Sequence, residues 1–484
     1  MNDLASSIVI DRVAVVDVET GQVRMDQSVH IAGDRIVGIS PSGAEPHATA
    51  SVVDGQDGYL IPGLWDMHVH GLQPSRWDWG SLLMVANGVT GMRNPATTRP
   101  LADIATIRSD VAAGRVIGPR FIAAGPLIDG LPPIFGDEFP TVGSPEEMRA
   151  LIASFHEQGA DFIKIYTRLD RESFYAAIDE AGKRGLPVAG HVPLSVTVAE
   201  ASDAGMKSVE HSYRHRMACV PAETEIRSML TEQIRAQADE DWSRYVEIEE
   251  STWQLGLDYS SDKTVALGER LARNGTWFVP TAVEMRSRFR PEHISEESFD
   301  ELFSDARLEY FPPATVTAWR DQLCHERGYL WGRANYSGDP EKVGTQIADD
   351  REREVANRLR MTGDLHAAGA GICAGTDASF NFPLVMMGFS LHEELELMVQ
   401  SGLTSLQALQ TATLNPARFL DATDRLGTIA EGKVADLVLL DANPLEDIRN
   451  TTRIRAVVLN GKPFDRTALD QLLAQAKAIV QPHQ

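Results

Sequence analysis

The sequence predicts an α/β protein in which a (β/α)8 TIM barrel is joined to a small β-sandwich domain formed by both chain ends. In the middle of the chain, short apolar runs alternate with helical stretches, which is typical of a parallel sheet wrapped by helices. At both ends, runs of β-branched residues are separated by glycine-containing turns instead. The length of 484 residues also exceeds what one simple core needs, so a second domain is expected.

The small β-sandwich domain is predicted at residues 1–60 and 418–484. Its N-terminal part contains SIVIDRVAVVD and QSVHIAGDRIVGIS, and its C-terminal part contains GKVADLVLLDANP and RIRAVVLNGKPF. These segments share one strand-like character, and strands far apart in a sequence often pair. We therefore expect the barrel, at residues 61–417, to be inserted between the two halves of the small domain.

Eight barrel strands are predicted from apolar runs in the middle of the chain. In order they are GLWDMHVH (63–70), VTGMRNP (89–95), RFIAAGPLI (120–128), FIKIY (162–166), PVAGHV (187–192), SVEHS (208–212), WFVPTA (277–282) and GICAGTD (371–377). Helix signals lie between them: Ser144 is an N-cap with Pro145 after it and Glu147 completing a capping box, and Gly185 ends the next helix. The active site of such a barrel lies at the carboxyl ends of its strands.

One connection is too long to be a simple loop. Residues 283–365, between the seventh and eighth strands, are rich in charges and aromatic residues and are predicted to be mainly helical. We interpret this stretch as an insertion above the barrel mouth that covers or shapes the substrate pocket. An oligomerisation surface or plain packing would explain the same composition.

Composition restricts the partners and the compartment. The formal charge of −24 lacks the basic footprint that nucleic acid or an anionic membrane requires. Cys219, Cys324 and Cys373 are too few and too far apart for a disulfide framework or a CxxC metal site. The N-terminus does not resemble a secretory signal, and no apolar run approaches the ~20 residues of a membrane span. We therefore expect a cytoplasmic protein. We also expect it to be a homo-oligomer that acts on a small-molecule substrate.

The stretch GLWDMHVHG contains two histidines inside an apolar run. In a β-strand, alternate side chains point to the same face, so Asp66, His68 and His70 would share one side. Burying that polar face is costly without a partner, and neutral imidazole is a common metal ligand. The alternative is a pair of core histidines satisfied by hydrogen bonds.

Further ligand-type side chains stand at the ends of other predicted strands. They are Lys164 on the fourth strand, His191 on the fifth, His211 on the sixth and Asp377 on the eighth. Each alone has an ordinary explanation as a strand lysine, a turn histidine or a helix cap. Together with the two histidines of the first strand they favour a metal site at the catalytic face.

This motif set resembles the amidohydrolase superfamily, most closely its imidazolonepropionase-like and prolidase-like branch. The resemblance covers most of the chain, including GYLIPGLWDMHVH and LGTIAEGKVADLVLLDANP, but not the insertion. It implies two divalent metal ions, most often zinc, and a CO2-derived carbamate on Lys164 that bridges them. The implied metal ligands are His68, His70, Lys164, His191, His211 and Asp377.

The resemblance also implies a reaction, the hydrolysis of an amide-type C–N bond in a dipeptide or N-acyl amino acid. A hydroxide shared by the metals would be the nucleophile, with Asp377 as general acid and base. Asp66 is expected to support an imidazole N–H. The alternatives are a mononuclear deaminase or cyclic-amide hydrolase, a lactone or ester hydrolase, and a non-catalytic scaffold. Against the deaminase, Leu194 stands where such enzymes usually have an acid.

Substrate contacts are predicted from strand parity. Tyr166 shares the parity of Lys164, and Tyr213 that of His211, so both are expected to point into the mouth; packing inside the barrel is the alternative. His215 is expected in a rim loop together with Arg216. Two departures from the branch weaken its substrate set: the second strand ends in RNP without an acid, and the fourth continues YTR without a Ser-Gly-Gly turn.

Overall fold

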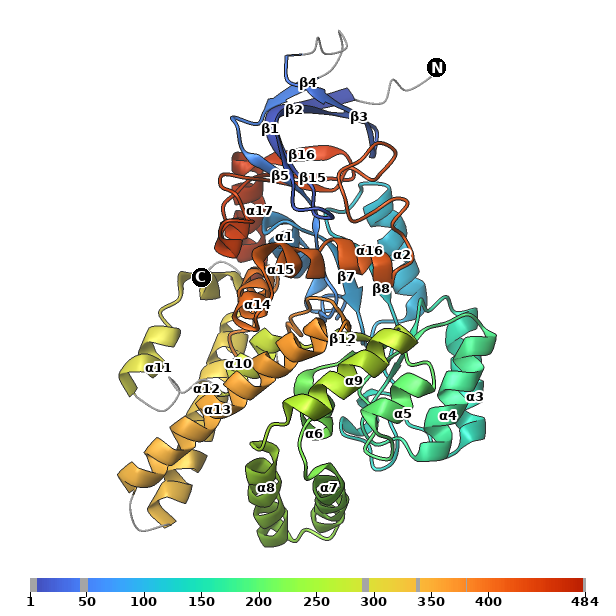
Figure 1. Ribbon diagram of the computed structural model, residues 1–484, viewed down its shortest axis with the longest axis vertical. Coiled ribbons are helices and arrows are strands. Elements are labelled where there is room, and N and C mark those ends of the chain that lie inside the picture. The colour runs from blue at the N-terminus through green and yellow to red at the C-terminus, as the bar shows by residue number, and fades with distance from the viewer. Residues whose placement is uncertain (1–6, 44–50, 290–295, 337–339, 380, 482–484) are drawn as a thin grey trace.

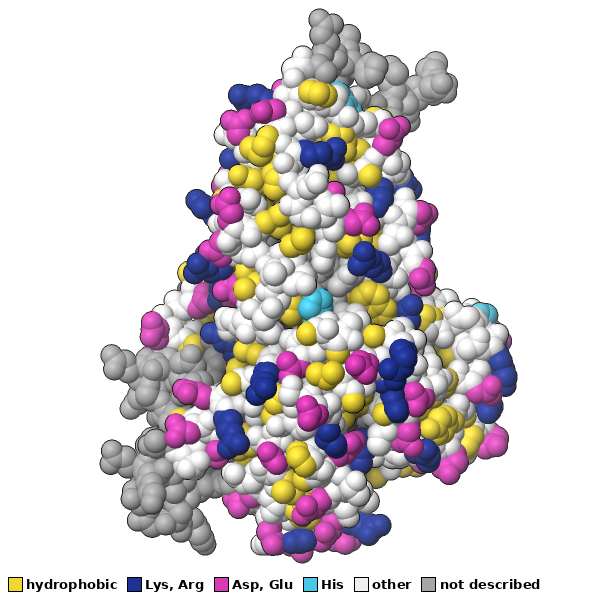
Figure 2. Space-filling view, viewed as in Figure 1, with side chains coloured by type: hydrophobic (Ala, Val, Ile, Leu, Met, Phe, Trp, Pro, Cys, Tyr) yellow, Lys and Arg dark blue, Asp and Glu magenta, His cyan; other side chains and the backbone are white. Residues whose placement is uncertain are grey.

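The computed structural model describes residues 7–43, 51–289, 296–336, 340–379 and 381–481. A small sheet domain lies at one end of an elongated molecule, a barrel-like α/β domain lies in the middle, and two helical hairpins extend from the other end (Figure 1). On the face drawn in Figure 2, acidic and basic side chains are interspersed rather than gathered by sign. Within the described chain we find no helix both long and apolar enough to cross a membrane.

The middle domain contains all eight predicted strands, each shorter than predicted. They are β6 (Leu64–Asp66), β7 (Val89–Asn94), β8 (Arg120–Ala123), β9 (Ile163–Ile165), β10 (Val188–Gly190), β11 (Ser208–Glu210), β12 (Trp277–Val279) and β13 (Gly371–Ile372). They pair in parallel as a three-stranded sheet, β6 to β8, and a five-stranded sheet, β9 to β13. Isolated parallel bridges, Ile128 to Ile165 and Val69 to Ala378, join the sheets on both sides. The domain is therefore a barrel-like α/β domain.

The helices around these strands begin where their capping residues predict. In α3 (Pro145–Glu157), the Ser144 side chain accepts a hydrogen bond from the backbone N–H of Glu147. The Glu147 carboxylate accepts from the Gly143 N–H, one residue earlier than a capping box requires. After α4 (Arg171–Lys183), Gly185 adopts a left-handed φ of 70°, a conformation that favours glycine over any residue with a Cβ.

Both chain ends join in one eight-stranded sheet. Its hydrogen-bonded order is β16-β15-β14-β5-β1-β2-β3, and β4 pairs with β1. The strands are β1 (Ser7–Val16), β2 (Val23–Ala32), β3 (Arg35–Pro41), β4 (Ser51–Asp54), β5 (Tyr59–Pro62), β14 (Leu437–Leu440), β15 (Ile454–Leu459) and β16 (Lys462–Asp465). The antiparallel pair β5–β14 joins the two ends, and the sheet has a hydrophobic core of its own. The sandwich arrangement and the domain boundaries stay predictions.

Two helical insertions extend from the strand ends. The predicted insertion between β12 and β13 is mainly helical over its described part, with α10 (Ala282–Phe289), α11 (Glu296–Leu302), α12 (Pro313–Tyr336) and α13 (Pro340–Ala367). A second hairpin, α7 (Glu223–Ala238) and α8 (Trp242–Gly256), lies between β11 and α9 (Ser261–Asn274) and was not predicted. Both hairpins lie on the side of the barrel away from the small sheet (Figure 1).

Candidate metal centre and active site

The carboxyl ends of four strands bring the predicted ligands together. His191 and His211 are the first residues after β10 and β11, His68 and His70 follow β6, and Asp377 follows β13. His211 has a φ of 63° and Asp377 a φ of 57°, a left-handed conformation that costs energy for residues with a Cβ and often marks functional sites. These five ligands therefore lie just beyond a strand, whereas the sixth predicted ligand, Lys164, lies within β9.

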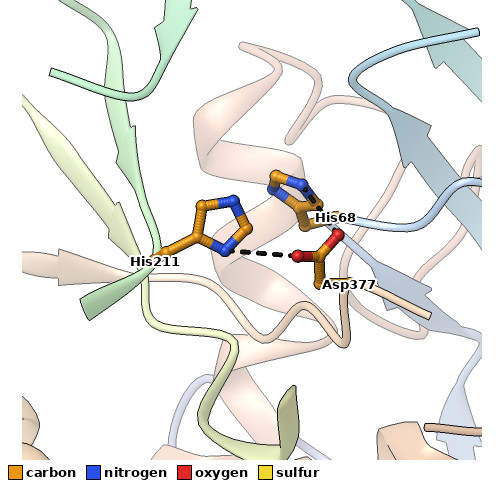
Figure 3. A group of neighbouring side chains, drawn as sticks. All are labelled: His68, His211 and Asp377. Carbon is orange, nitrogen blue, oxygen red and sulfur yellow. Dashed lines mark ion pairs between the residues drawn. The ribbon is translucent and has the colours of Figure 1, made fainter. Parts of the chain in front are cut away.

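His68, His211 and Asp377 form the centre of the site (Figure 3). Their potential ligand atoms all lie within 4.8 Å of one another, and all three residues are buried. Asp377 Oδ1 is 3.4 Å from His68 Nε2 and 3.0 Å from His70 Nε2, and Asp377 Oδ2 is 3.5 Å from His211 Nδ1. The His191 ring lies beside the His211 ring, with their centroids 4.7 Å apart.

Outer contacts fix which nitrogens face this centre. His68 Nδ1 lies 2.7 Å from Glu210 Oε2, and His70 Nδ1 lies 3.1 Å from the Ala96 carbonyl, so each Nδ1 donates and each Nε2 faces the centre. Burial and nearby positive charge hold the pKa of His68 well below its usual range, so this imidazole is neutral and its Nε2 keeps its lone pair. A lone-pair nitrogen thus faces the Asp377 carboxylate without a proton between them, an arrangement that a metal cation would satisfy.

The outer two histidines have hydroxyl partners. His191 Nδ1 lies 3.0 Å from Thr167 Oγ1, and His211 Nδ1 lies 2.9 Å from Thr281 Oγ1. A hydroxyl can donate or accept, so these contacts orient the rings without fixing the tautomer. Burial lowers the pKa of His211 well below its usual range, which keeps it neutral and able to bind a metal.

Lys164 lies against this group as a buried amine. It is 2% exposed, and among the described residues its Nζ has no hydrogen-bond partner. Burial lowers its pKa to about 8, although Glu210 and Asp377 oppose that shift. Gly190 makes room for its side chain, because a Cβ there would lie 2.9 Å from Lys164 Cδ and 2.2 Å from a backbone oxygen. The unmodified amine is thus confined near the ligands without a partner.

A buried acid that the sequence analysis missed holds the His68 ring. Glu210 accepts hydrogen bonds from His68 Nδ1, from Arg93 Nη2 at 2.6 Å and from Ser208 Oγ at 2.5 Å. Burial opposes its ionisation, but Arg93 and Lys164 outweigh that effect and bring the pKa of Glu210 below its ordinary value. The signal in the sequence was an acid directly before the histidine in the predicted strand SVEHS.

Asp66 has a different role from the one predicted. It accepts hydrogen bonds from the His68 backbone N–H at 3.1 Å and from the Thr376 hydroxyl at 2.6 Å and backbone N–H at 3.1 Å. The prediction that it supports an imidazole was wrong, because Glu210 occupies that position. Asp66 instead fixes the segment that carries Asp377. Burial raises its pKa to about 7.

The predicted substrate residues differ in their surroundings. The centroid of the Tyr166 ring lies 4.0 Å from that of His191 and 5.4 Å from that of Phe135. Tyr166 therefore lies beside the predicted metal ligands. The Tyr213 ring lies 5.7 Å from that of His211, but its hydroxyl donates to Glu284 at 2.6 Å. The side chain of His215 lies outside the described residues. Its backbone belongs to helix α6 (Ser212–Ala218), so the predicted rim loop was wrong.

A cavity of about 390 Å³ opens beside His191 and Glu210 and runs under the α7–α8 hairpin. Its inner end is bordered by Thr167, His191 and Tyr213. Its outer wall comes from α7 and α8. A volume of this size lies within the range of small-molecule binding sites. The hairpin absent from our prediction therefore shapes the candidate substrate site.

A protein-family model and a curated protein match parts of this sequence. The model of the amidohydrolase family matches residues 59–253 and 294–464, most of the chain. A deaminase of 5-methylthioadenosine and S-adenosylhomocysteine from Moorella thermoacetica is 30% identical over 142 residues, which cover 25% of this chain and 32% of that protein. The chain thus aligns with only about a third of that curated relative's length.

Solved structures match over nearly the whole chain. A bottromycin amidohydrolase aligns with a TM-score of 0.71 and 24% identity, covering 98% of this chain and 90% of that one. A Xaa-Pro dipeptidase with bound methionine aligns with a TM-score of 0.63 and 20% identity, covering 95% and 100%. At these identities the structural likeness establishes the fold.

Proposed function

We propose a reaction from the premise that this chain belongs to the amidohydrolase family and is a hydrolase acting on C–N bonds. The proposed reaction is cleavage of the amide bond of dipeptides or N-acyl amino acids. One observation carries the proposal: neutral imidazole nitrogens, a carboxylate and an unpartnered buried lysine converge at the strand ends. The family is metal-dependent, and this donor set fits divalent metal ions, for which zinc is a common choice.

The residues present would hold two ions. His68, His70 and Asp377 would bind the more buried ion, and His191 and His211 the outer one. Bound divalent metal supplies a Lewis acid for the substrate carbonyl and lowers the pKa of coordinated water. The identity of the metal would follow partly from its availability.

Lys164 would bridge the ions after carboxylation. Its pKa of about 8 gives a larger fraction of free amine at neutral pH than an ordinary lysine has. The free amine would attack CO2, forming an N–C bond and releasing one proton, and the carbamate would carry one negative charge on two oxygens. An ammonium there would instead be repelled by the divalent ions.

Two further side chains would handle the substrate. Asp377 would take the proton of the attacking water and pass it to the leaving nitrogen. Its Oδ1 has no hydrogen-bond partner among the described residues, so the carboxylate is not committed to another donor. Tyr166 would orient the substrate from its position beside His191. The cytoplasmic location and the homo-oligomeric state are parts of the same proposal.

A deaminase is the second candidate, because the curated relative from Moorella thermoacetica carries that name. Deaminases of this kind need an acid near the fifth strand, where this chain has Leu194, and they give Lys164 no task. Leu194 also packs in the apolar cluster of Met217 and Ile226. Amide hydrolysis is therefore the better supported reaction.

Metal counting and a substrate panel test the proposal together. We expect two tightly bound divalent ions per chain and hydrolysis of dipeptides or N-acyl amino acids by zinc-loaded protein supplied with bicarbonate. An Asp377→Asn variant should lose turnover while keeping its fold. One ion per chain with ammonia release from aminopurine nucleosides would favour the deaminase. Full turnover by the Asp377→Asn variant would remove that carboxylate from its role.

A further inference from the structure

The cavity beside the metal centre contains two arginines that share one acid. Arg216 Nε lies 2.7 Å from Glu354 Oε1, and Arg358 Nε donates to the same oxygen at 2.6 Å. Glu354 is fully buried, and both arginines line the cavity. Two positive charges and one negative charge leave an excess of one positive charge. A buried excess of this kind is costly unless an anion joins it.

The surrounding helices hold both guanidinium groups in place. Arg216 Nη2 donates to the Trp253 carbonyl at 3.2 Å, and Arg358 Nη1 donates to Ser212 Oγ at 2.9 Å. Gly256 leaves room for the Arg216 guanidinium, because a Cβ there would lie 2.0 Å from its Nη2. None of the described residues accepts from Arg216 Nη1 or Arg358 Nη2. Each arginine therefore keeps one terminal nitrogen for a further acceptor.

One part of the remaining cavity wall is apolar. Met217 and Ile226 are buried in one hydrophobic cluster, which Leu230 also contacts, and Trp253 lies on the α8 side. The Arg216 guanidinium lies 5.5 Å from the Trp253 ring centroid. A ligand that fills the cavity would present an apolar group to this wall and an anionic group to the arginines.

We propose that the Arg216–Arg358 pair binds the free carboxylate of the substrate, and that the apolar wall binds the side chain of its carboxy-terminal residue. This assignment rests on the proposed amide hydrolysis and narrows its substrates to dipeptides and N-acyl amino acids that end in a hydrophobic residue. Both arginines and His191 line the cavity, so a substrate whose carboxylate binds the arginines would extend toward the metal ligands.

Neighbouring charges leave this preference intact. Two acids also line the cavity. The Glu210 carboxylate is paired with the buried Arg93, and Glu249 is exposed, so solvent screens its charge. The Arg288 guanidinium carbon lies 5.5 Å from the centroid of the Tyr213 ring, and Arg288 donates to Glu284. Arg288 is not among the residues that line the cavity. The Arg216–Arg358 pair is thus the cationic feature of the cavity itself.

Binding of two non-hydrolysable probes, 3-phenylpropanoate and 3-phenylpropanamide, tests the inference by calorimetry. Wild-type protein should bind the carboxylate at least about 10-fold more tightly than the amide, since a charged hydrogen-bonded contact is worth ~1.5–3 kcal/mol. Arg216→Met should weaken carboxylate binding about 10- to 100-fold and leave amide binding within about twofold. The preference should survive removal of metal with a chelator.

Matched variants control the experiment. Arg235→Met removes an exposed arginine of the same hairpin and should change neither affinity. Arg216→Lys keeps the charge without the planar fork and should give an intermediate loss, and it serves if Arg216→Met does not fold. Leu230→Trp should raise the KM for N-acetylphenylalanine but not for N-acetylglycine.

The outcomes separate this inference from the proposed function. If Arg216→Met and Arg216→Lys both keep the full preference for the carboxylate, or the preference vanishes with the metal, the carboxylate binds elsewhere and the inference is wrong. If wild-type protein hydrolyses no N-acyl amino acid yet shows the arginine-dependent preference, the proposed reaction fails while the cavity assignment stands.

Discussion

Replacing Glu210 by glutamine tests whether the buried network behind His68 sets metal affinity. Glutamine has nearly the same shape, so its oxygen can still accept from His68 and Arg93. Its amide can donate to the Ser208 hydroxyl, which now donates to Glu210. The hydrogen bonds can therefore survive while the negative charge is lost. The change isolates the contribution of charge.

Two effects follow from the contacts. Arg93 is 1% exposed and would lose its charged partner, although it keeps the rings of Phe162 and Phe419 at 5.6 and 5.0 Å. Leaving one member of a buried ion pair alone costs ~3–5 kcal/mol. We therefore expect Glu210→Gln to lower the free energy of unfolding by that amount. Without a negative charge beside its Nδ1–H, His68 is a less basic ligand. It should bind metal about 10- to 100-fold more weakly, as other metal-binding histidines do when the group that accepts their second N–H is lost.

Urea unfolding of metal-free protein and zinc competition with a chromogenic chelator measure the two effects separately. Ser208→Ala is the matched control, because it keeps the charge of Glu210 and removes only the two hydrogen bonds of the hydroxyl, one to Glu210 and one from Arg93 Nη1. It should cost ~1–3 kcal/mol and leave zinc affinity nearly unchanged. If Glu210→Gln binds zinc as tightly as wild type and loses no more stability than Ser208→Ala, the network has no role in tuning the ligand.

Three further changes probe the centre and its support. Lys164→Met should retain the fold but bind fewer than two metal ions per chain, measured by elemental analysis; two retained ions would contradict the bridging role. Asp377→Asn should lower kcat at least about 100-fold if proton transfer contributes ~10²–10⁴-fold, with circular dichroism as the control for folding. Burial raises the pKa of Glu394 to about 8, so the folded protein holds a proton that the unfolded chain releases, and stability falls as pH rises from about 5 to 8. Glu394→Gln should flatten that fall in urea titrations at pH 5 and 8, and an unchanged slope would refute this account.

The sequence was most informative where one polar residue interrupts an apolar run. His191 and His211 follow strands of three residues that are fully buried, so their positions at the strand ends could be inferred from pattern alone. The same holds for the start of α3, where Ser144 and Pro145 determine the first turn. The likeness of the whole motif set to the amidohydrolase superfamily is confirmed by the family match.

Other features depend on contacts that strand periodicity does not encode. His68 and His70 lie on the same side, as parity predicts, but Asp66 does not lie beside them, because the strand ends at Asp66. The chain turns there, and Asp66 accepts a hydrogen bond from Thr376 on the neighbouring segment after β13. Glu210 reaches His68 from a segment 142 residues away. Such pairings follow from the closure of the strands, which local sequence does not specify.

The α7–α8 hairpin shows why the centre was easier to predict than the substrate. Metal chemistry restricts ligand types strongly, so histidine, lysine and aspartate at several strand ends are informative as a set. A substrate wall needs only volume and polarity, which many sequences supply. The proposed role of Arg216 in binding a carboxylate depends on two contacts. Glu354 on α13 is shared between Arg216 and Arg358, and Gly256 on α8 leaves space for the Arg216 guanidinium. Those residues come from three separate helices, so the charge excess that selects an anion is a property of their packing.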